Sequence, residues 1–243
     1  MDPSLLALVV PIIILVSNTT RSTFGFGGGL MAMPLLAMVV DVRIATPLVA
    51  LIANTDALAI LLTEWRNVRL ASAWRLVVAS LLGVPLGLLF ITGAYEGVAK
   101  LSLALVVIGF SLYNFLKHRH HALTGERTAL IFGFFAGILG GAFNANGPLV
   151  VIYGKLRDWP TERFRATLQG YFFPVGLLTI SSHAVAGLVT PTVLRLYLVS
   201  LPAVVLAFLI GRRLSRLLTA GKFDRLVYLL LMALGVTLLV QTL

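Results

Sequence analysis

The sequence contains no cysteine, and only 12% of its 243 residues are charged. Without cysteine the chain can form no disulfide, no thiolate nucleophile and no cysteine-ligated metal site. It also has no polar stretch long enough to form a domain outside a membrane. Because a soluble domain of this length needs a far more polar surface than a composition of 59% hydrophobic residues provides, that class is excluded.

Long apolar runs recur along the chain at 44–62, 74–91, 98–116, 166–186, 193–210 and 226–240. Each run is long enough, or nearly so, to cross a lipid bilayer as a helix, and none shows the alternating period of a barrel strand. The first four residues, "MDPS", carry an acid and no base, so we expect no cleaved signal peptide. The sequence therefore predicts an all-α polytopic membrane protein, integral to the inner cell membrane.

Acidic residues are scarce: 9 Asp and Glu stand against 19 Lys and Arg. The bases gather in the short loops 64–75, 117–127, 155–165 and 212–225 and are sparse in 41–43, 92–100 and 188–195. Such alternation is typical of membrane topology signals, whereas a nucleic-acid partner would require one continuous basic face. We therefore expect no nucleic-acid partner, and we expect the rich loops to be cytoplasmic.

Two basic loops follow one another, at 117–127 and 155–165, so the segment 130–154 must enter and leave by the same face. Its middle, "GGAFNANGP", predicts two short helices joined by an irregular tip. By the same parity, residues 5–40, which contain "SNTTRSTFGFGGG", form a hairpin that enters from outside. Arms of about 10–15 residues would reach about 15–20 Å into a hydrocarbon core of about 30 Å. Re-entrant hairpins and two tilted full crossings both satisfy this parity.

The two halves resemble each other in order: "GGGLMAMPL" in the first corresponds to "GGAFNANGPL" in the second. The first repeat is 1–116, with hairpin 5–40 and spans 44–62, 74–91 and 98–116. A cytoplasmic basic linker follows at 117–127. The second repeat is 128–243, with hairpin 130–154 and spans 166–186, 193–210 and 226–240. Because each half makes an odd number of passes, the sequence predicts two inverted repeats, each a broken-helix hairpin plus three transmembrane helices, as in secondary transporters.

The hairpin tips carry groups suited to binding an anion. Glycines at the start of a half-helix expose backbone N–H groups at its positive end and allow a ligand to approach closely. The residues expected to bind substrate in this way are Gly27, Gly28, Gly29, Gly140 and Gly141, with the amides of Asn144 and Asn146. The alternative is that the glycines only allow helices to pack closely, which we favour for Gly25 and Gly137.

Arg21 and Asp56 are charged residues in otherwise apolar surroundings. A charge at membrane depth is costly, by about 2.5–3.5 kcal/mol on insertion scales, so each should be paired or hydrated. Arg21 either adds positive charge to the anion site, forms an ion pair with Asp56, or extends to the membrane surface. Asp56, beside Asn54, either carries a coupled proton or is a structural partner of Arg21.

Further polar residues within the spans are candidates for lining a cavity: Thr23, Gln169 and Tyr171. His183 lies late in its span and is interpreted as a packing or helix-end residue. Three histidines, His118, His120 and His121, crowd a basic loop with little carboxylate, and we interpret that loop as solvated. The sequence therefore predicts neither a metal site nor a cofactor.

At "FGFGGGLMAMPLL", "ATPLVALIANT" and "GGAFNANGPLVVIY" the chain resembles the sulfite exporter TauE/SafE family of membrane transporters, and the resemblance extends over nearly its whole length. The resemblance implies a substrate among sulfur-containing anions, such as sulfite, sulfate and sulfonates, or other small organic anions.

These observations predict a secondary transporter that moves a small anion by alternating access. Coupling to protons and assembly as a homodimer are left open. An anion channel is one alternative. A membrane-embedded enzyme is another, although the sequence has no HExxH motif, no paired carboxylates and no Ser/His/Asp grouping at membrane depth. The chain also lacks a phosphate-binding loop of the Walker type, which excludes an ATP-driven pump built from this chain alone.

Overall fold

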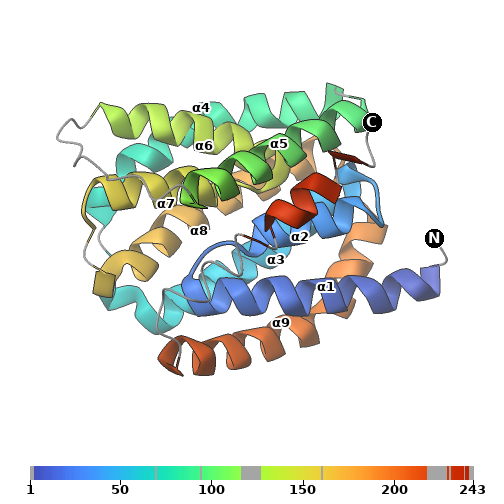
Figure 1. The fold of residues 1–243 in the computed structure, drawn as a ribbon, viewed down its shortest axis with the longest axis horizontal. Coiled ribbons are helices and arrows are strands. Elements are labelled where there is room, and N and C mark those ends of the chain that lie inside the picture. The colour runs from blue at the N-terminus through green and yellow to red at the C-terminus, as the bar shows by residue number, and fades with distance from the viewer. Residues whose placement is uncertain are drawn as a thin grey trace.

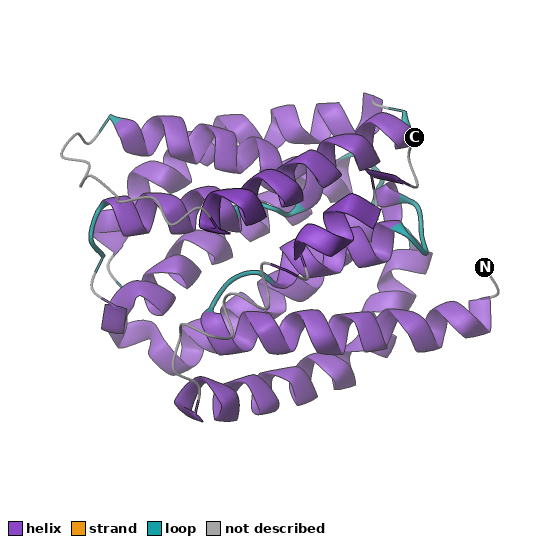
Figure 2. Ribbon diagram, viewed as in Figure 1, coloured by secondary structure: helices purple, strands orange, loops and turns teal. Residues whose placement is uncertain are grey.

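The computed structural model describes residues 3–68, 70–93, 95–115, 127–159, 161–217, 229, 231–237 and 239–240. These described residues form helices joined by short turns, with no strand among them, which confirms the all-α class (Figure 2). The elements are α1 (Pro3–Phe24), α2 (Gly28–Ala37), α3 (Val42–Glu64), the 3₁₀ helix η1 (Trp65–Asn67), α4 (Leu70–Gly93), α5 (Glu96–Phe115), α6 (Thr128–Phe143), α7 (Gly147–Leu156), α8 (Thr161–Val185) and α9 (Pro191–Leu217).

Four helical stretches are long and apolar enough to cross a bilayer: Leu5–Phe24, Val42–Asn67, Ala73–Gly93 and Pro191–Leu214. The helices α3, α4, α5, α8 and α9 correspond to the first five predicted spans, within one residue at the C-terminal ends of α5 and α8. Of the sixth, 226–240, the structure describes a helix at 231–237 and a few neighbouring residues. The linker 117–127, with its histidines, lies outside the described residues apart from Arg127. The grouping of these helices into two inverted repeats stays a prediction.

The first hairpin differs from the expected pair of short arms. Its first arm, α1, has 22 residues and continues through the polar stretch that follows Ser17. The hydroxyls do not interrupt the helix because they donate to carbonyls one turn earlier: Ser17 to Ile13 at 2.8 Å and Thr23 to Thr19 at 2.7 Å. By length, α1 can therefore cross a membrane, whereas α2, with 10 residues, cannot.

The second hairpin has the expected short arms, α6 with 16 residues and α7 with 10. Helix α6 ends where Asn144 adopts a left-handed conformation, with φ of 54°. The N–H of Asn144 donates to the carbonyl of Gly140, and that of Ala145 donates to the carbonyl of Leu139, a pairing typical of helix C-termini. Pro148 then lies in the first turn of α7, where its missing N–H costs no hydrogen bond.

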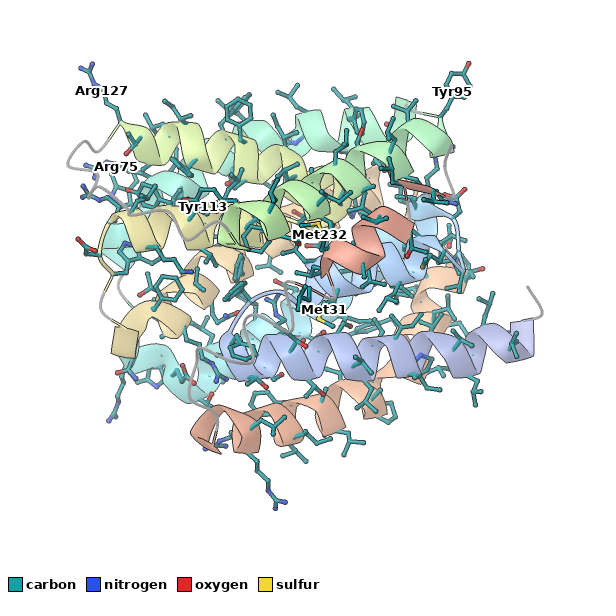
Figure 3. The ribbon with its side chains drawn as sticks, viewed as in Figure 1. Met31, Arg75, Tyr95, Tyr113, Arg127 and Met232 are labelled. Atoms are coloured by element: carbon teal, nitrogen blue, oxygen red, sulfur yellow. The ribbon has the colours of Figure 1, made fainter. Side chains whose placement is uncertain are left out.

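The helices run largely along one long direction, so the assembly has two distinct ends (Figure 1). Helix α6 begins and α7 finishes at the same end, as the charge pattern requires. Figure 3 shows Arg75 and Arg127 at that end and Tyr95 at the opposite one. Met31, in α2, projects between the two ends in the same view. Which end faces the cytoplasm stays a prediction.

Helices α4 and α6 pack so closely that their backbones touch at a row of glycines. A Cβ atom added at Gly137 would lie 2.8 Å from the Cα of Ser80, and one added at Gly133 would lie 2.5 Å from the carbonyl oxygen of Leu76. Gly141 continues this row against the backbone of Val84. Small residues at such crossings are a common means of helix association in membranes. The close packing fixes the second hairpin against α4.

Candidate functional site

The two helix breaks lie against each other. A Cβ atom added at Gly29, in the first turn of α2, would lie 2.6 Å from the carbonyl oxygen of Asn144 in the break between α6 and α7. In the first break, Gly25 and Gly27 have φ of 82° and 91°, which side-chain-bearing residues rarely adopt. The start of α2 and the second break, predicted separately as tips, are therefore neighbours in the folded chain.

Arg21 of α1 lies directly over the start of α2. A Cβ atom added at Gly28 would lie 2.8 Å from the Cβ of Arg21 and 3.3 Å from Oδ1 of Asn18. Gly28 thus leaves the space that the arginine side chain occupies. The side chain of Arg21 is only 7% exposed, so it does not extend to the protein surface, and that alternative does not hold.

The guanidinium of Arg21 contacts groups from two other helices. Nη2 donates to Oε1 of Gln169 at 3.4 Å, and Nε lies 4.0 Å from Oδ2 of Asp56. The guanidinium carbon also lies 5.2 Å from the ring centroid of Phe172, within reach of a cation–π contact. The charge is therefore held by α3 and α8 together.

Asp56 is 1% exposed, yet neither of its carboxylate oxygens accepts a hydrogen bond from the described residues. Nε of Arg21 likewise donates none to them. The ion pair is therefore close enough for the charges to offset each other, but it leaves donors and acceptors available. A buried pair left in this way lacks the additional hydrogen bonds that offset the cost of removing two charges from water.

Gln169 links Arg21 to the first break. Its Nε2 donates to the carbonyl of Gly25 at 2.7 Å, which places Oε1 toward Arg21. Gln169 is fully buried, and Arg165, one turn earlier on α8, packs against Gly25: an added Cβ at Gly25 would lie 2.7 Å from Cγ of Arg165. Nε of Arg165 also lies 3.4 Å from Oε1 of Glu64. These contacts cover the first break from the end of the assembly where α3 finishes.

The remaining predicted residues fall into two groups. Asn144 and Asn146 lie in the second break, and Nδ2 of Asn144 is buried without a hydrogen-bond partner in the described chain. The side chain of Asn146 lies 3.3 Å from a Cβ atom added at Gly140. These groups border the junction of the breaks. Gly27 begins α2 as its N-cap residue.

The second group contacts neighbouring helices. Tyr171 shares a 2.8 Å hydrogen bond with Ser80 of α4 and also hydrogen-bonds the Asn146 side chain in the second break, and Thr23 donates within α1. Asn54 packs against Gly176, with its Oδ1 buried and without a partner among the described residues, and Gly141 packs against α4. These residues tie the helices together around the junction.

Two contributors were not selected from the sequence. Asn18 lies one turn before Arg21, beside Gly28, and its place in the polar stretch could have identified it. Phe172, which lies beneath the Arg21 guanidinium, carries no signal that separates it from other apolar residues of its span. Nε2 of His183 donates to the carbonyl oxygen of Gly141 at 2.9 Å, because a carbonyl oxygen can only accept. This hydrogen bond joins the end of α8 to α6.

The fold and the buried charged cluster define an α-helical integral membrane protein with interrupted helices at its centre. The profile of the sulfite exporter TauE/SafE family matches residues 9–238, and the chain belongs to that family. The family is one of membrane transporters, which supports transport of an anion across the membrane. Comparison with curated proteins and with solved structures gives no match.

Proposed function

We propose that the protein is a secondary transporter that binds a small anion between its two helix breaks, and that a sulfur-containing oxyanion such as sulfite, sulfate or an organosulfonate is its substrate. The observation that carries this proposal is the buried guanidinium of Arg21 beside the first turn of α2. The first N–H groups of that helix have no partners within the helix, and they add to the positive end of its dipole. An oxyanion can accept hydrogen bonds from both sources.

The second break supplies neutral donors on the other side of the same junction. The amide of Asn144 has a buried, unpartnered Nδ2, and Asn146 lies beside Gly140. Neutral amide donors hold an anion more weakly than a second cationic side chain would. Weak binding suits a carrier, which has to release its substrate on the other side of the membrane. The substrate-binding set is then Arg21, Gly27, Gly28, Gly29, Gly140, Asn144 and Asn146.

Asp56 gives this site a means of coupling to protons. In the empty site the negative charge of Asp56 offsets Arg21 at 4.0 Å. When an anion takes over the guanidinium, Asp56 is left as an unpaired buried carboxylate and takes up a proton. The site is then neutral both when it is empty and when it holds a monovalent anion, so it can reorient across the membrane without moving net charge.

Alternating access requires that each side of the site open in turn. We take the structure to represent a closed state of this cycle, a proposal supported by the 7% exposure of the Arg21 side chain. At the end of the assembly where α3 finishes, we assign the closure to Arg165, which covers Gly25 and pairs with Glu64 at 3.4 Å. An ion pair that is partly exposed is weak enough to open and close during transport.

The proposal is tested by counterflow in proteoliposomes across a panel of sulfite, sulfate, organosulfonates and carboxylates. A carrier gives saturable uptake of labelled anion that is accelerated by the same anion inside the vesicles. An anion channel gives a current that rises with concentration without saturation and shows no such acceleration. Arg21→Gln, with insertion checked in the same vesicles, separates uptake through the proposed site from leakage.

A further inference from the structure

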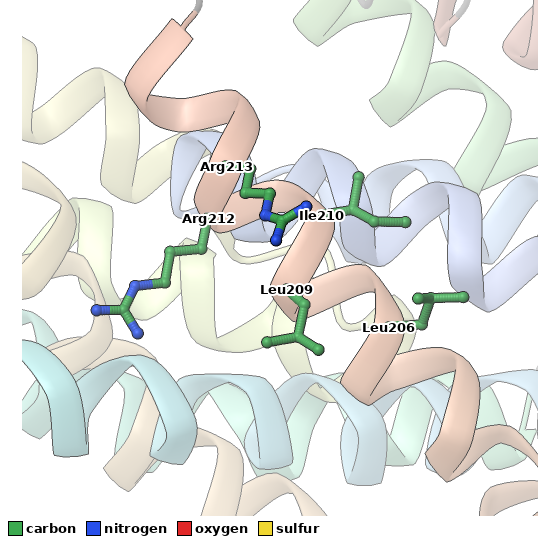
Figure 4. Close-up of a pocket in the computed structure, with 5 residues that line it drawn as sticks. All are labelled: Leu206, Leu209, Ile210, Arg212 and Arg213. Atoms are coloured by element: carbon green, nitrogen blue, oxygen red, sulfur yellow. The ribbon is translucent and has the colours of Figure 1, made fainter.

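A hollow on the outer surface of α9 combines apolar and basic side chains (Figure 4). It is lined by Leu206, Leu209, Ile210, Arg212 and Arg213. The three apolar side chains are exposed by 49%, 55% and 37%, respectively. In a bilayer, such surface is covered by lipid chains. The neighbouring arginines make this hollow different from an ordinary apolar helix face.

The charged side chains that line the hollow among the described residues are both arginines. Two guanidinium groups and no carboxylate are found among the described residues that line it. Arg212 lies close enough to Arg165 of α8 for the two positive charges to repel each other, and Arg165 already pairs with Glu64. An anion bound beside Arg212 and Arg213 would reduce this repulsion.

The order of the side chains along α9 sets the shape of the occupant. Leu206, Leu209 and Arg213 follow one another at the spacing of a single helix face. At a rise of about 1.5 Å per residue, the arginine lies about 10 Å beyond the first leucine. Apolar side chains are therefore followed by basic ones within a short distance along the helix. The basic side chains lie near the C-terminal end of α9, which is at the same end of the assembly as the start of α6 (Figure 1). We expect that end to face the cytoplasm, where anionic lipid is enriched.

We propose that this hollow binds an anionic phospholipid, with its headgroup phosphate at Arg212 and Arg213 and an acyl chain along Leu206 and Leu209. The lipid site is separate from the junction at Arg21, but the helix that carries it, α9, contacts the helix that carries Arg21, α1. Gly211 packs against Ser22, the residue next to Arg21, so close that an added Cβ would overlap the serine Cβ. A lipid held here fixes the position of α9 against the helix that carries Arg21.

Binding can be measured without transport, so the result is independent of the proposed substrate. The purified full chain is titrated with phosphatidylglycerol or phosphatidylcholine in detergent, and bound lipid is counted by native mass spectrometry. The test variant is Arg212→Gln with Arg213→Gln. Arg195→Gln is the matched control, because Arg195 is an exposed arginine near the opposite end of the same helix.

We expect one phosphatidylglycerol to bind the wild-type chain in preference to phosphatidylcholine. At about 1 kcal/mol for each arginine, the double variant should bind it about 30-fold more weakly, and Arg213→Gln alone about 5-fold. Arg195→Gln should bind as the wild type does. Melting curves in lipid-free detergent check that each variant is folded, since both replaced side chains are exposed.

Three results would overturn the proposal. Equal binding of the two lipids would show an apolar surface without headgroup recognition. Loss of phosphatidylglycerol in Arg195→Gln to the same extent as in the double variant would show a general effect of surface charge. Stabilisation of the wild type by inorganic phosphate as strong as that by phosphatidylglycerol would show an anion site that needs no acyl chain.

Discussion

Replacing Arg21 by Gln separates the two roles that its geometry allows. At 4.0 Å and an effective dielectric constant of about 20, the attraction between Arg21 and Asp56 is about 4 kcal/mol. Removing the arginine leaves a carboxylate that is 1% exposed without a positive partner. We expect the free energy of unfolding to fall by about 3 kcal/mol, because part of the loss is recovered when Asp56 takes up a proton.

The double variant Arg21→Gln with Asp56→Asn should recover most of that stability, with a coupling free energy of about 2–4 kcal/mol, since neither charge is then buried alone. Anion affinity should behave differently. Losing charge-assisted hydrogen bonds worth about 1.5–3 kcal/mol weakens binding about 10- to 150-fold in both the single and the double variant. Arg21→Lys, which keeps the charge without the planar fork, should fall between wild type and Arg21→Gln.

The assays are melting curves in detergent and titration calorimetry with the anion that gives counterflow. If stability recovers in the double variant and affinity does not, Arg21 both pairs with Asp56 and binds substrate. If affinity is unchanged in every variant, Arg21 is only a structural partner. If neither quantity changes, the Arg21–Asp56 pair contributes neither to stability nor to anion binding.

Three further predictions follow from the same contacts. When the wild-type protein binds the anion in weakly buffered detergent, it should take up about one proton per anion, measured with a pH indicator. The Asp56→Asn variant should take up none. Equal proton uptake by the wild type and the variant would show that another residue is the coupling group. Gly28→Val should abolish counterflow in a chain that still inserts, because the valine side chain displaces Arg21. Gly137→Val should instead lower the melting temperature, because it pushes helices α4 and α6 apart. Wild-type transport by Gly28→Val would contradict the proposed site. Glu64→Gln, which frees Arg165 from its 3.4 Å ion pair, should speed labelling of a cysteine introduced at the first break, and unchanged labelling would show that this pair is not a gate.

The sequence was sufficient for elements whose signal is local. Apolar length predicts α3, α4 and α9, and the glycine-rich and asparagine-rich stretches predict both breaks. It predicted too short a helix for α1, because an arm of about 10–15 residues would end within the run of serine, threonine and asparagine that begins at Ser17. In the folded protein those hydroxyls bond back to their own helix, as Thr19 does to Leu15 at 2.7 Å, and the helix continues to Phe24.

The composition of the site depends on contacts that no local pattern encodes. Gln169 meets Arg21 across 148 positions of the chain, and only the fold, in which α3 packs against both α8 and α1, brings them together. The pairing of Arg21 with Asp56 was one of several alternatives until the structure placed the two side chains 4.0 Å apart. Phe172 became part of the site only because its ring lies beneath a buried guanidinium.

We propose above all that a small oxyanion crosses the membrane by binding at Arg21. Counterflow of labelled sulfite or organosulfonate into proteoliposomes, compared between the wild type and Arg21→Gln at equal protein content, tests it most directly. We expect saturable uptake by the wild type that is accelerated by internal anion, and loss of that uptake at the same concentration in Arg21→Gln. Uptake by Arg21→Gln at the wild-type rate, with the same saturation, would contradict it.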